Sequence, residues 1–390
     1  MIPEGWEIRK LGELCAPKQW HTIGREEMTE TGYRVFGANG FIGHYPEANH
    51  MEDTVVITCR GATCGEVTIV PGPSYITGNA MCLDAIDTRI VSPSLLADLV
   101  RHAGPKHLIS GSAQPQIIRA DVRKFEVLVP PLIEQPIIEA LLKHWDSAIE
   151  KVGALIANAR AQKQALMQQL LSGHRRLPGF SEPWEWADFA DIFGRVRTKN
   201  AEGNTNVLTI SAQHGLISQV EYFNKSVASD DVRGYTLLQR GDFAYNKSYS
   251  DGYPMGAIKP LDRYDSGIVS SLYICFRLTR RGFDHDFFRH YFEAGLFNRE
   301  IAAIAQEGAR NHGLLNVSVV EFFETSLHIP QPGEQAAIAK VINAAEAEEK
   351  AYQAQLTALR QEKAALMQQL LTGKRRVKLP ENLAHERETA

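Results

Sequence analysis

Two long stretches of the chain, 134–172 and 334–372, carry apolar residues that recur every seven positions. Along the first stretch, two adjacent lines of positions hold Leu142, Ile149, Ile156, Lys163 and Leu170, and Ile138, Trp145, Val152, Ala159 and Leu166. Along the second, the corresponding positions hold Ile342, Glu349, Leu356, Lys363 and Leu370, and Ile338, Ala345, Tyr352, Leu359 and Leu366. Five heptads predict two long helices that form a coiled coil. Because each helix alone would leave its apolar seam in water, we expect the two helices to pack on each other.

The two stretches are copies of one another. The segment from Lys163 to Arg176 returns as Lys363 to Arg376, at an offset of 200 residues. The match continues backwards at the same offset through a proline and a Glu-Gln pair, at Pro130, Pro330, Glu134, Gln135, Glu334 and Gln335. A register held over about fifty residues without a gap indicates two copies of one structural unit, at about 1–176 and 177–376.

The ends of both stretches carry signals of helix boundaries. Prolines precede each helix, and Glu134 and Glu334 lie where the positive end of the helix dipole favours an anion. Gly173 and Gly373 follow the last periodic residue and suit a left-handed C-cap. The basic triplet after each glycine has two interpretations. It either compensates the helix dipole within a solvated linker, or it contacts phosphate groups.

The body of each unit has the composition of a β-rich domain. Runs of β-branched and aromatic residues between turn residues predict strands at 54–58, 66–70, 207–210, 242–245 and 271–276. Glycine and proline predict turns at 37–40 and 71–73. Short helices are predicted at 95–102 and 287–297.

The two bodies resemble each other only at a few anchors. The proposed equivalences are 40–43 with 215–218, 65–67 with 256–258, and 78–83 with 267–272. Between these anchors the sequences differ almost completely, whereas the helices are nearly the same. A protein that used both units for one reaction should repeat its reactive residues, and this chain repeats its helices and varies its bodies.

Composition and charge limit the class of protein. The 390 residues are 44% hydrophobic with a formal net charge of −4, so bulk attraction to a polyanion is excluded and any nucleic-acid contact must come from local patches or partners. The five cysteines are odd in number, and Cys59 and Cys64 have no second pair at metal-ligand spacing, so we expect neither a disulfide framework nor a metal site. No signal sequence or membrane span is evident, and we expect a cytoplasmic, reduced protein.

The repeated motifs resemble those of the specificity (S) subunits of type I restriction–modification enzymes. The resemblance covers essentially the whole chain and depends on motifs that occur twice and in the same order. They are the helix starts at 130–138 and 330–338, the helix ends at 166–173 and 366–373, and the body motifs at 60–65 and 245–250.

This resemblance implies an α+β fold with a pseudo-two-fold internal repeat. Two β-rich target-recognition domains would be joined by two long antiparallel α-helices that form a coiled coil. The expected boundaries are 1–130 for the first recognition domain, 131–176 for a central helix, 177–330 for the second recognition domain, 331–376 for a C-terminal helix and 377–390 for a polar tail.

The resemblance also implies a function and partners. Each recognition domain would bind one half of a split, asymmetric sequence in double-stranded DNA. The helices would set the gap and dock two methyltransferase (M) subunits, which hold the methyl donor and modify adenine, and restriction (R) subunits would add ATP-driven translocation and cleavage. The S subunit itself would catalyse nothing and need no cofactor.

Motif searches agree with a non-catalytic role. The chain has no phosphate-binding P-loop, no adenine-methylation motif of the Asn/Asp-Pro-Pro-Tyr type and no nuclease constellation, and the glycines at 37–43 are typical of a hairpin turn. Two other classes remain open at this point. One is an internally repeated DNA-modifying enzyme, and the other is a coiled-coil interaction protein that binds no nucleic acid.

Candidate DNA-contacting residues follow from the chemistry of base recognition. Arg or Lys recognises guanine, and Asn or Gln recognises adenine, from loops that a rigid sheet holds in place. In the first body the candidates are Arg60, Thr63, Lys106, His107, Gln114 and Gln116. In the second body they are Asn246, Lys247, Tyr249, Ser250, Arg310, Asn311 and His312. For each residue the alternative is a solvated loop position or a phosphate contact.

Overall fold

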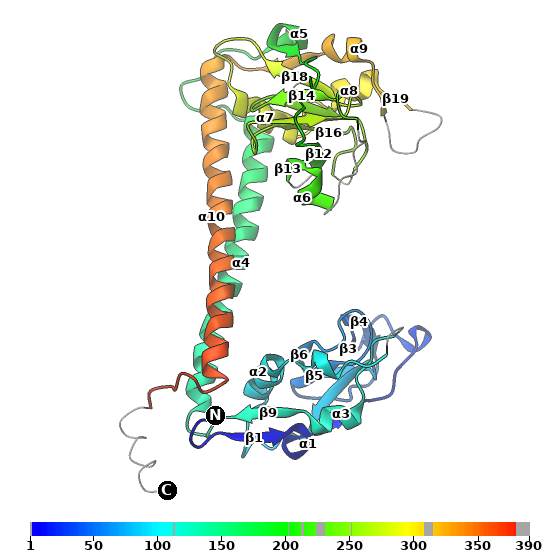
Figure 1. Ribbon diagram of the computed structural model, residues 1–390, viewed down its shortest axis with the longest axis vertical. Helices are drawn as coiled ribbons and strands as arrows, with labels where there is room; N and C mark the ends of the chain where they lie inside the picture. The colour runs from blue at the N-terminus through cyan, green and yellow to red at the C-terminus, as the bar shows by residue number, and fades with distance from the viewer. Residues whose placement is uncertain are drawn as a thin grey trace. The chain divides into compact units, whose positions relative to one another are not determined.

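The computed structural model describes residues 2–111, 114–201, 203–211, 214–223, 231–250, 252–307 and 315–379 (Figure 1). It divides into two compact units, one formed by 1–153 with 354–390 and the other by 154–353. Each unit contains one β-rich body and part of both long helices, so the two units are described in turn.

The two predicted helices are present as α4 (Gln135–Leu170) and α10 (Pro332–Leu370) (Figure 1). All twenty heptad positions are buried or half-buried, which confirms the seam. In the first unit an ion pair between the helices joins Asp146 to Lys363, and in the second unit another joins Lys163 to Glu349. Because the partner number in α10 falls as the number in α4 rises, the helices are antiparallel, as expected.

Each helix ends beside the start of the other, where an arginine meets a buried glutamate. In the second unit, Nε and Nη2 of Arg176 donate to the two carboxylate oxygens of Glu334, each at 2.6 Å. In the first unit, Arg376 makes the equivalent pair with Glu134. The glutamates are 1% and 2% exposed, so the basic triplets supply ion pairs between the helices at these two arginines, which neither earlier interpretation described.

The glutamine after each of these glutamates joins the helix to the preceding strand. Gln135 Nε2 donates to the carbonyl of Pro130 at 2.9 Å, and Gln335 Nε2 donates to that of Pro330 at 2.8 Å. Both glutamines are buried. The repeated Pro…Glu-Gln motif therefore has a structural explanation in each copy.

The first unit contains a four-stranded antiparallel sheet and a smaller three-stranded sheet (Figure 1). The four strands run in the order β2 (Ala16–Lys18), β8 (Ala80–Asp84), β5 (Thr54–Thr58) and β6 (Val67–Val70). The smaller sheet has the order β4 (Gly40–Tyr45), β3 (Tyr33–Gly37) and β7 (Ser74–Ile76), and a separate pair joins β1 (Glu7–Lys10) to β9 (Glu126–Val129). The helices are α1 (Leu11–Leu14), η1 (Arg25–Glu27), α2 (Pro93–Ala103), η2 (Pro105–Leu108) and α3 (Arg119–Lys124).

The core of the first unit is largely aliphatic. Helix α2 is capped at its start by Ser92, whose side chain accepts the backbone N–H of Leu95, and at its end by Gly104 in the left-handed region. Leu95, Leu96, Leu99 and Val100 on one face of α2 join the same core as Val55 and Ile57 of β5. Burying each such side chain contributes about 1.5–3 kcal/mol, which fixes the helix on the central strand of the sheet.

The second unit repeats the four-stranded sheet. Its strands run in the equivalent order β11 (Phe193–Arg195), β18 (Ile274–Leu278), β15 (Phe243–Asn246) and β16 (Ala257–Pro260). Four strand pairs join β10 (Glu185–Asp188) to β21 (Ser326–Ile329), β12 (Leu208–Ser211) to β13 (Gly215–Ser218), β14 (Thr236–Gln239) to β17 (Ser266–Val269), and β19 (Gln306–Glu307) to β20 (Leu315–Asn316). The helices are α5 (Phe189–Ile192), α6 (Gln219–Phe223), α7 (His285–Glu293), α8 (Asn298–Ile304) and α9 (Val319–Phe323).

The core of the second unit is aromatic where that of the first is aliphatic. Phe193 packs on Phe189 with ring centroids 4.7 Å apart and on Phe288 at 4.9 Å. Phe189 also packs edge-on against Phe322 at 5.0 Å. The same strand order is thus filled by different side chains, which explains why the body sequences share so few anchors.

The predicted body elements are confirmed with ends that shift by a residue or two, and two of them shift further. The strand predicted at 271–276 begins at Ile274, and the helix predicted at 287–297 spans His285–Glu293. The proposed equivalence of 78–83 with 267–272 is wrong. In the order of the second four-stranded sheet, the place that β8 holds in the first is taken by β18, whereas β17 lies outside that sheet. Within the described part of the chain, no helix has an apolar stretch sufficient to cross a lipid bilayer.

Candidate nucleic-acid interface

The first group of candidates gathers where β5 ends. Arg60 forms an isolated antiparallel bridge with Gln116, and Gln116 pairs with Ser110 through two backbone hydrogen bonds of 2.9 Å. The N–H of Ile117 donates to the carbonyl of Cys59 at 3.0 Å. The arrangement places the exposed side chains of Arg60 and Gln116 on neighbouring backbone segments, although 56 residues separate them in the chain.

Thr63 has a role that sequence patterns did not indicate. Its hydroxyl lies 2.8 Å from Oδ1 of Asn39 and 3.1 Å from the carbonyl of Ala38, at the tip of the β3–β4 hairpin. The hydroxyl hydrogen is therefore directed to the hairpin, and the Asn39 side chain is exposed beside the turn. Asn39 was missed because the glycines around it predicted only a turn. The presence of an amide side chain at the tip of a predicted hairpin could have indicated Asn39 as a candidate.

Lys106 lies against the same turn because Gly65 has no side chain to keep it away. Gly65 has φ +85°, and a Cβ at this position would lie 3.0 Å from Cγ and 3.2 Å from Cα of Lys106. Only glycine permits this approach without strain. The structure therefore brings together Arg60, Thr63, Lys106 and Gln116.

The remaining two candidates of the first body differ from these four. Gln114 is exposed, and its carbonyl lies close to Gly111 in the tight loop that leads to Gln116. The Nδ1–H of His107 donates to the carbonyl of Gly104 at 2.8 Å, and its ring packs on Phe125 at 5.4 Å between centroids. These contacts give His107 a packing role on the helical side of the loop.

The second group of candidates follows β15, the strand equivalent to β5. Asn246 Oδ1 accepts the N–H of Ser248 at 3.1 Å, and the Lys247 carbonyl accepts the N–H of Leu315 at 3.0 Å. Ser250 exchanges backbone hydrogen bonds with Tyr253, and Tyr249, which precedes Ser250, is 62% exposed. The turn is thus held by β20 on one side, much as the first turn is held by the segment at 116–117. Arg310, Asn311 and His312 lie outside the described residues.

The two turns occupy equivalent places in the fold. Each follows the central strand of a four-stranded sheet and leads, through Gly65 or Gly256, into the edge strand β6 or β16. Both glycines have positive φ, at +85° and +75°. The anchors 65–67 and 256–258 are therefore structurally equivalent, whereas the polar residues before them differ between the units.

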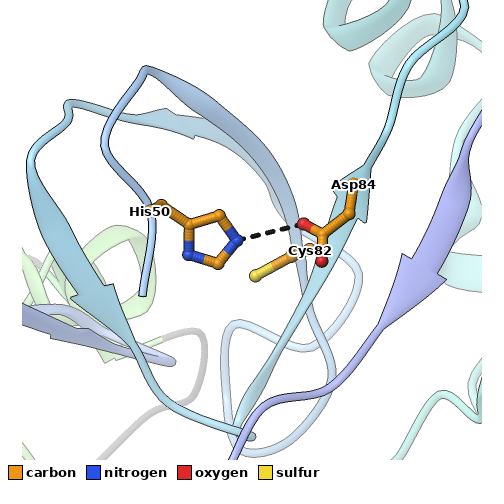
Figure 2. A group of neighbouring side chains, drawn as sticks. All are labelled: His50, Cys82 and Asp84. Carbon is orange, nitrogen blue, oxygen red and sulfur yellow. Dashed lines mark hydrogen bonds and ion pairs between the residues drawn. The ribbon is translucent and has the colours of Figure 1, made fainter. Parts of the chain in front are cut away.

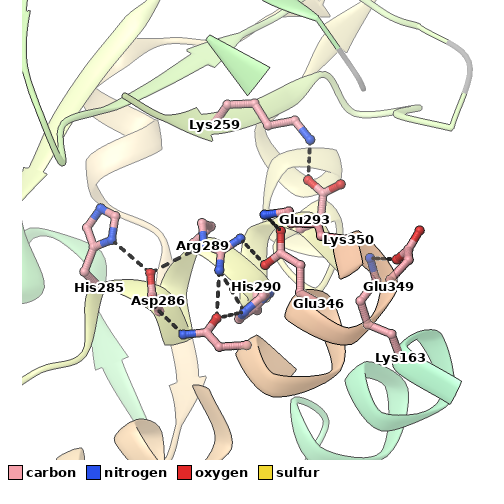
Figure 3. A network of polar contacts seen from close by, with 11 residues as sticks. Lys163, Lys259, His285, Asp286, Arg289, His290, Glu293, Glu346, Glu349 and Lys350 are labelled. Carbon is pink, nitrogen blue, oxygen red and sulfur yellow. Dashed lines mark hydrogen bonds and ion pairs between the residues drawn. The ribbon is translucent and has the colours of Figure 1, made fainter. Parts of the chain in front are cut away.

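A charged cleft of about 950 Å³ lies within the second unit, between its body and its part of the helix pair (Figure 3). Its lining includes six basic side chains, Arg160, Lys163, Lys259, Arg263, Arg289 and Lys350, and three acidic ones, Asp262, Glu293 and Glu346. Most of these charges are paired. Lys163 lies 2.6 Å from Glu349, Lys350 lies 2.8 Å from Glu346, and Lys259 pairs with Glu293.

Arg289 connects the body to the helix pair in this cleft. It lies 2.9 Å from Glu346 and 2.8 Å from Asn343 Oδ1, both on α10, and 3.4 Å from Asp286 on its own helix α7. Burial alone would raise the pKa of Glu346, but Lys350 and Arg289 outweigh that effect and hold the pKa at about 2. The ion pairs that line the cleft therefore form a structural network that joins α7 to α10 at neutral pH (Figure 3).

Comparison with known proteins identifies the class of the first body. Residues 3–157 match the family model described as the type I restriction modification DNA specificity domain. The resemblance inferred from the repeated motifs is thereby confirmed.

Two kinds of relative are similar to the chain. The specificity subunit of the type I restriction enzyme EcoprrI from Escherichia coli is 27% identical over 153 residues, which span 37% of this chain and 37% of that subunit. The crystal structure of a type I restriction–modification S subunit from M. genitalium superposes with a TM-score of 0.59 at 16% identity, covering 93% of this chain and 95% of that one.

A second solved chain supports the same fold. It comes from a study of complex assembly and conformational transition of the type I R–M system, and it matches with a TM-score of 0.58 at 16% identity, covering 95% of this chain and 98% of that one. These structures confirm the expected α+β fold, with two β-rich domains and two long helices in contact.

Proposed function

We propose that this chain is the non-catalytic DNA-recognition subunit of a type I restriction–modification enzyme, in which each β-rich body recognises one half of a bipartite, asymmetric target. One observation carries the proposal. Two bodies of equivalent strand order present chemically different polar turns after equivalent strands, and the first body lies in the segment that matches a DNA specificity domain. A pair of similar supports with different contact residues is what recognition of two unlike half-sites requires.

The turns after β5 and β15 would supply the base contacts. In the first domain, Arg60 and Lys106 suit guanine, and Gln114, Gln116 and the newly noted Asn39 suit adenine. Thr63 would position Asn39, and His107 would support the loop. In the second domain, Asn246, Lys247, Tyr249 and Ser250 would act together with the loop residues predicted from sequence, Arg310, Asn311 and His312.

The antiparallel helices would serve as the spacer and the docking surface. The 36 residues of α4 measure about 54 Å at 1.5 Å per residue. We propose that two M subunits dock on this helix pair, and that R subunits join them in complexes that cleave DNA. Because the chain has a net charge of −4, tight DNA binding would depend on basic surfaces of these partners in the cytoplasm.

The proposed domain boundaries define the experiment. Exchanging 177–330 for the second body of an unrelated S subunit, and then mapping methylated adenines in a host that also carries the M subunits, should change one half of the target. The first half-site should stay the same, because 1–130 is untouched. Band shifts with and without M subunits should show weak binding by the chain alone.

Two outcomes would overturn the proposal. Methyl transfer or DNA cleavage by the purified chain would place it among the enzymes. Formation of a stable complex with M subunits that protects no DNA sequence would favour a coiled-coil interaction protein.

A further inference from the structure

Three potential metal ligands converge in the first unit, and none of them belongs to the proposed DNA-contacting turn. Figure 2 shows the side chains of His50, Cys82 and Asp84 directed toward one another. Their ligand atoms all lie within 4.8 Å of one another. His50 lies in the segment between β4 and β5, and the other two lie on β8, so sequence spacing could not reveal the group.

The hydrogen bonds of Asn49 determine which nitrogen of His50 carries a hydrogen. Asn49 Nδ2 donates to the Ile76 carbonyl at 3.0 Å, and Asn49 Oδ1 accepts the Ile76 N–H at 2.8 Å. The orientation of the amide is therefore fixed by the backbone of β7. Since Oδ1 also lies 2.7 Å from His50 Nδ1, that nitrogen must be the donor.

Nε2 of His50 then faces an acceptor. It lies 3.0 Å from Oδ1 of Asp84, and Oδ2 of the same carboxylate accepts Nε1–H of Trp20 at 3.0 Å. A neutral imidazole with its hydrogen on Nδ1 presents only a lone pair at Nε2, and an ionised carboxylate presents only lone pairs. Two lone pairs at this distance require a cation between them, which is either a proton or a metal ion.

Cys82 makes a metal ion the better match. Its side chain is fully buried, and among the described residues its thiol has no hydrogen-bond partner. A proton shared by His50 and Asp84 would leave this sulfur only its apolar packing in the cluster that includes Val56 and Ile76, although it lies beside two other potential ligands. A set of one imidazole nitrogen, one sulfur and one carboxylate oxygen is the ligand combination that zinc accepts.

We propose that His50 Nε2, Cys82 Sγ and Asp84 Oδ1 bind one zinc ion, with a solvent molecule as the fourth ligand. Asn49 and Trp20 would orient the histidine and the carboxylate, as outer-shell partners do in zinc sites. Binding would release the thiol proton to solvent. A cation lies nearby, because Lys18 is the strand partner of Cys82 and its Nζ lies 3.4 Å from the centroid of the Trp20 ring.

The position of the group defines what the ion would do. It would join the segment before β5 to strand β8, and Asn49 extends the connection to β7 of the smaller sheet. The zinc ion would therefore hold the two sheets of the first unit together. This role concerns stability and does not depend on the proposed DNA recognition.

The test uses the full chain stripped with a chelator and then titrated with Zn²⁺ or Co²⁺. We expect one zinc per chain by native mass spectrometry, a higher melting temperature for the first unit, and a thiolate-to-cobalt charge-transfer band with Co²⁺. The cobalt band needs no substitution, so it tests sulfur ligation even if every variant misfolds. Failure of the wild-type chain to bind one zinc or to show this band would overturn the proposal in favour of the proton.

Matched variants identify the ligands. Cys82→Ser and His50→Gln should each lose the bound zinc and its thermal effect, and Cys82→Ser should also lose the cobalt band. Cys275→Ser is the control, because Cys275 is a buried cysteine of the other unit that belongs to no metal-ligating group among the described residues. Zinc binding by Cys82→Ser or His50→Gln at the wild-type stoichiometry would contradict the assignment.

Discussion

At the scale of single residues, the geometry of the turn after β5 separates the exposed side chains that we propose contact DNA from the side chains that support the turn. Arg60 and Gln116 are exposed neighbours, whereas the Thr63 hydroxyl is committed to Asn39 and the Ala38 carbonyl. An amide whose oxygen is already positioned loses less conformational entropy when it contacts a base. The turn therefore combines a flexible cation with a preorganised amide.

Replacing Arg60 by alanine should affect one half-site only. If Arg60 donates two hydrogen bonds to a guanine, Arg60→Ala should cost roughly 1–3 kcal/mol of binding and relax recognition at that base pair. The measurement is binding of the reconstituted complex to duplexes with single base changes, with the exposed Arg89→Ala as the control. A uniform loss on every duplex, with a shallower salt dependence, would instead identify a phosphate contact.

A double-mutant cycle should show that Thr63 acts through Asn39. Thr63→Val keeps the shape and removes the hydroxyl, which should weaken discrimination at one base pair by roughly 1 kcal/mol. Asn39→Ala should cost more, and the double variant should lose no more than Asn39→Ala alone. Additive losses would show that the two residues act independently. Thr68→Val on β6 is the control, since this threonine is exposed on a strand.

At the scale of elements, the two copies of the helix seam carry different charges at related places. Lys163 and Arg160 both contact Glu349, at 2.6 and 3.1 Å, and the Glu349 side chain is 8% exposed. Lys363 contacts Asp146, whose side chain is 58% exposed. Lys163 and Lys363 are equivalent in the repeat, but only the partner of Lys163, Glu349, is buried.

This difference predicts unequal effects of removing the two carboxylates. Glu349→Gln leaves two cations beside a buried position and should destabilise the second unit by roughly 1–3 kcal/mol. Asp146→Asn removes an exposed partner and should cost less than about 1 kcal/mol in the first unit. Hydrogen exchange of helix amides in each unit measures both values. Equal losses would show that burial of the partner does not control the contribution.

The network around Arg289 predicts a dependence on acidic pH. The pKa of Glu346 in the folded chain is held at about 2, below its ordinary value of 4.5, so its stabilising effect is fully present above pH 4.5. It is lost as pH falls from 4.5 toward 2, because protonation removes the pairs with Arg289 and Lys350. The loss for the second unit should reach roughly 3 kcal/mol.

Equilibrium unfolding between pH 6 and pH 2 tests this dependence. Glu346→Gln should be less stable than the wild type near pH 6 and should show a flatter profile. Glu362→Gln, an exposed position on the same helix, is the control and should keep the wild-type slope. An unchanged slope in Glu346→Gln would assign the acid sensitivity to other groups.

At the scale of the whole molecule, the paired helices are the part that the two units share. The unit boundary crosses α4 at Gly153 and Ala154, and crosses α10 at Gln353 and Ala354. Insertions at these two points would lengthen both helices of an antiparallel pair at corresponding places. A seven-residue insertion preserves the heptad register, and therefore the seam.

Adding one heptad at both points should lengthen the gap between the half-sites. Seven residues add about 10 Å, which corresponds to roughly three base pairs at 3.4 Å per pair. Mapping of methylated adenines measures the new gap, and seven residues added to the 377–390 tail serve as the control. An unchanged gap, with both half-sites still recognised, would disprove the role of the helices as a spacer.

Local patterns determined the helices, the repeat and most strands of this chain. A heptad or an alternating strand is a property of neighbouring residues, so 134–172, 334–372 and 54–58 could be predicted without knowing the fold. The candidates Arg60 and Gln116 were also accessible, because residue type and a loop position define their chemistry. The mistaken equivalence of 78–83 shows the limit, since short glycine anchors do not specify strand order.

Only the tertiary structure determined the contacts between residues that are far apart in the chain. The pairing of Arg176 with Glu334, the bond from Thr63 to Asn39 and the convergence of His50 with Cys82 depend on which strands and helix ends become neighbours. That choice is made by packing of the whole unit, and a single hydroxyl, guanidinium or thiol carries no local pattern that names its partner. The sequence by itself therefore determined the elements and their repetition, whereas the fold determined which side chains meet.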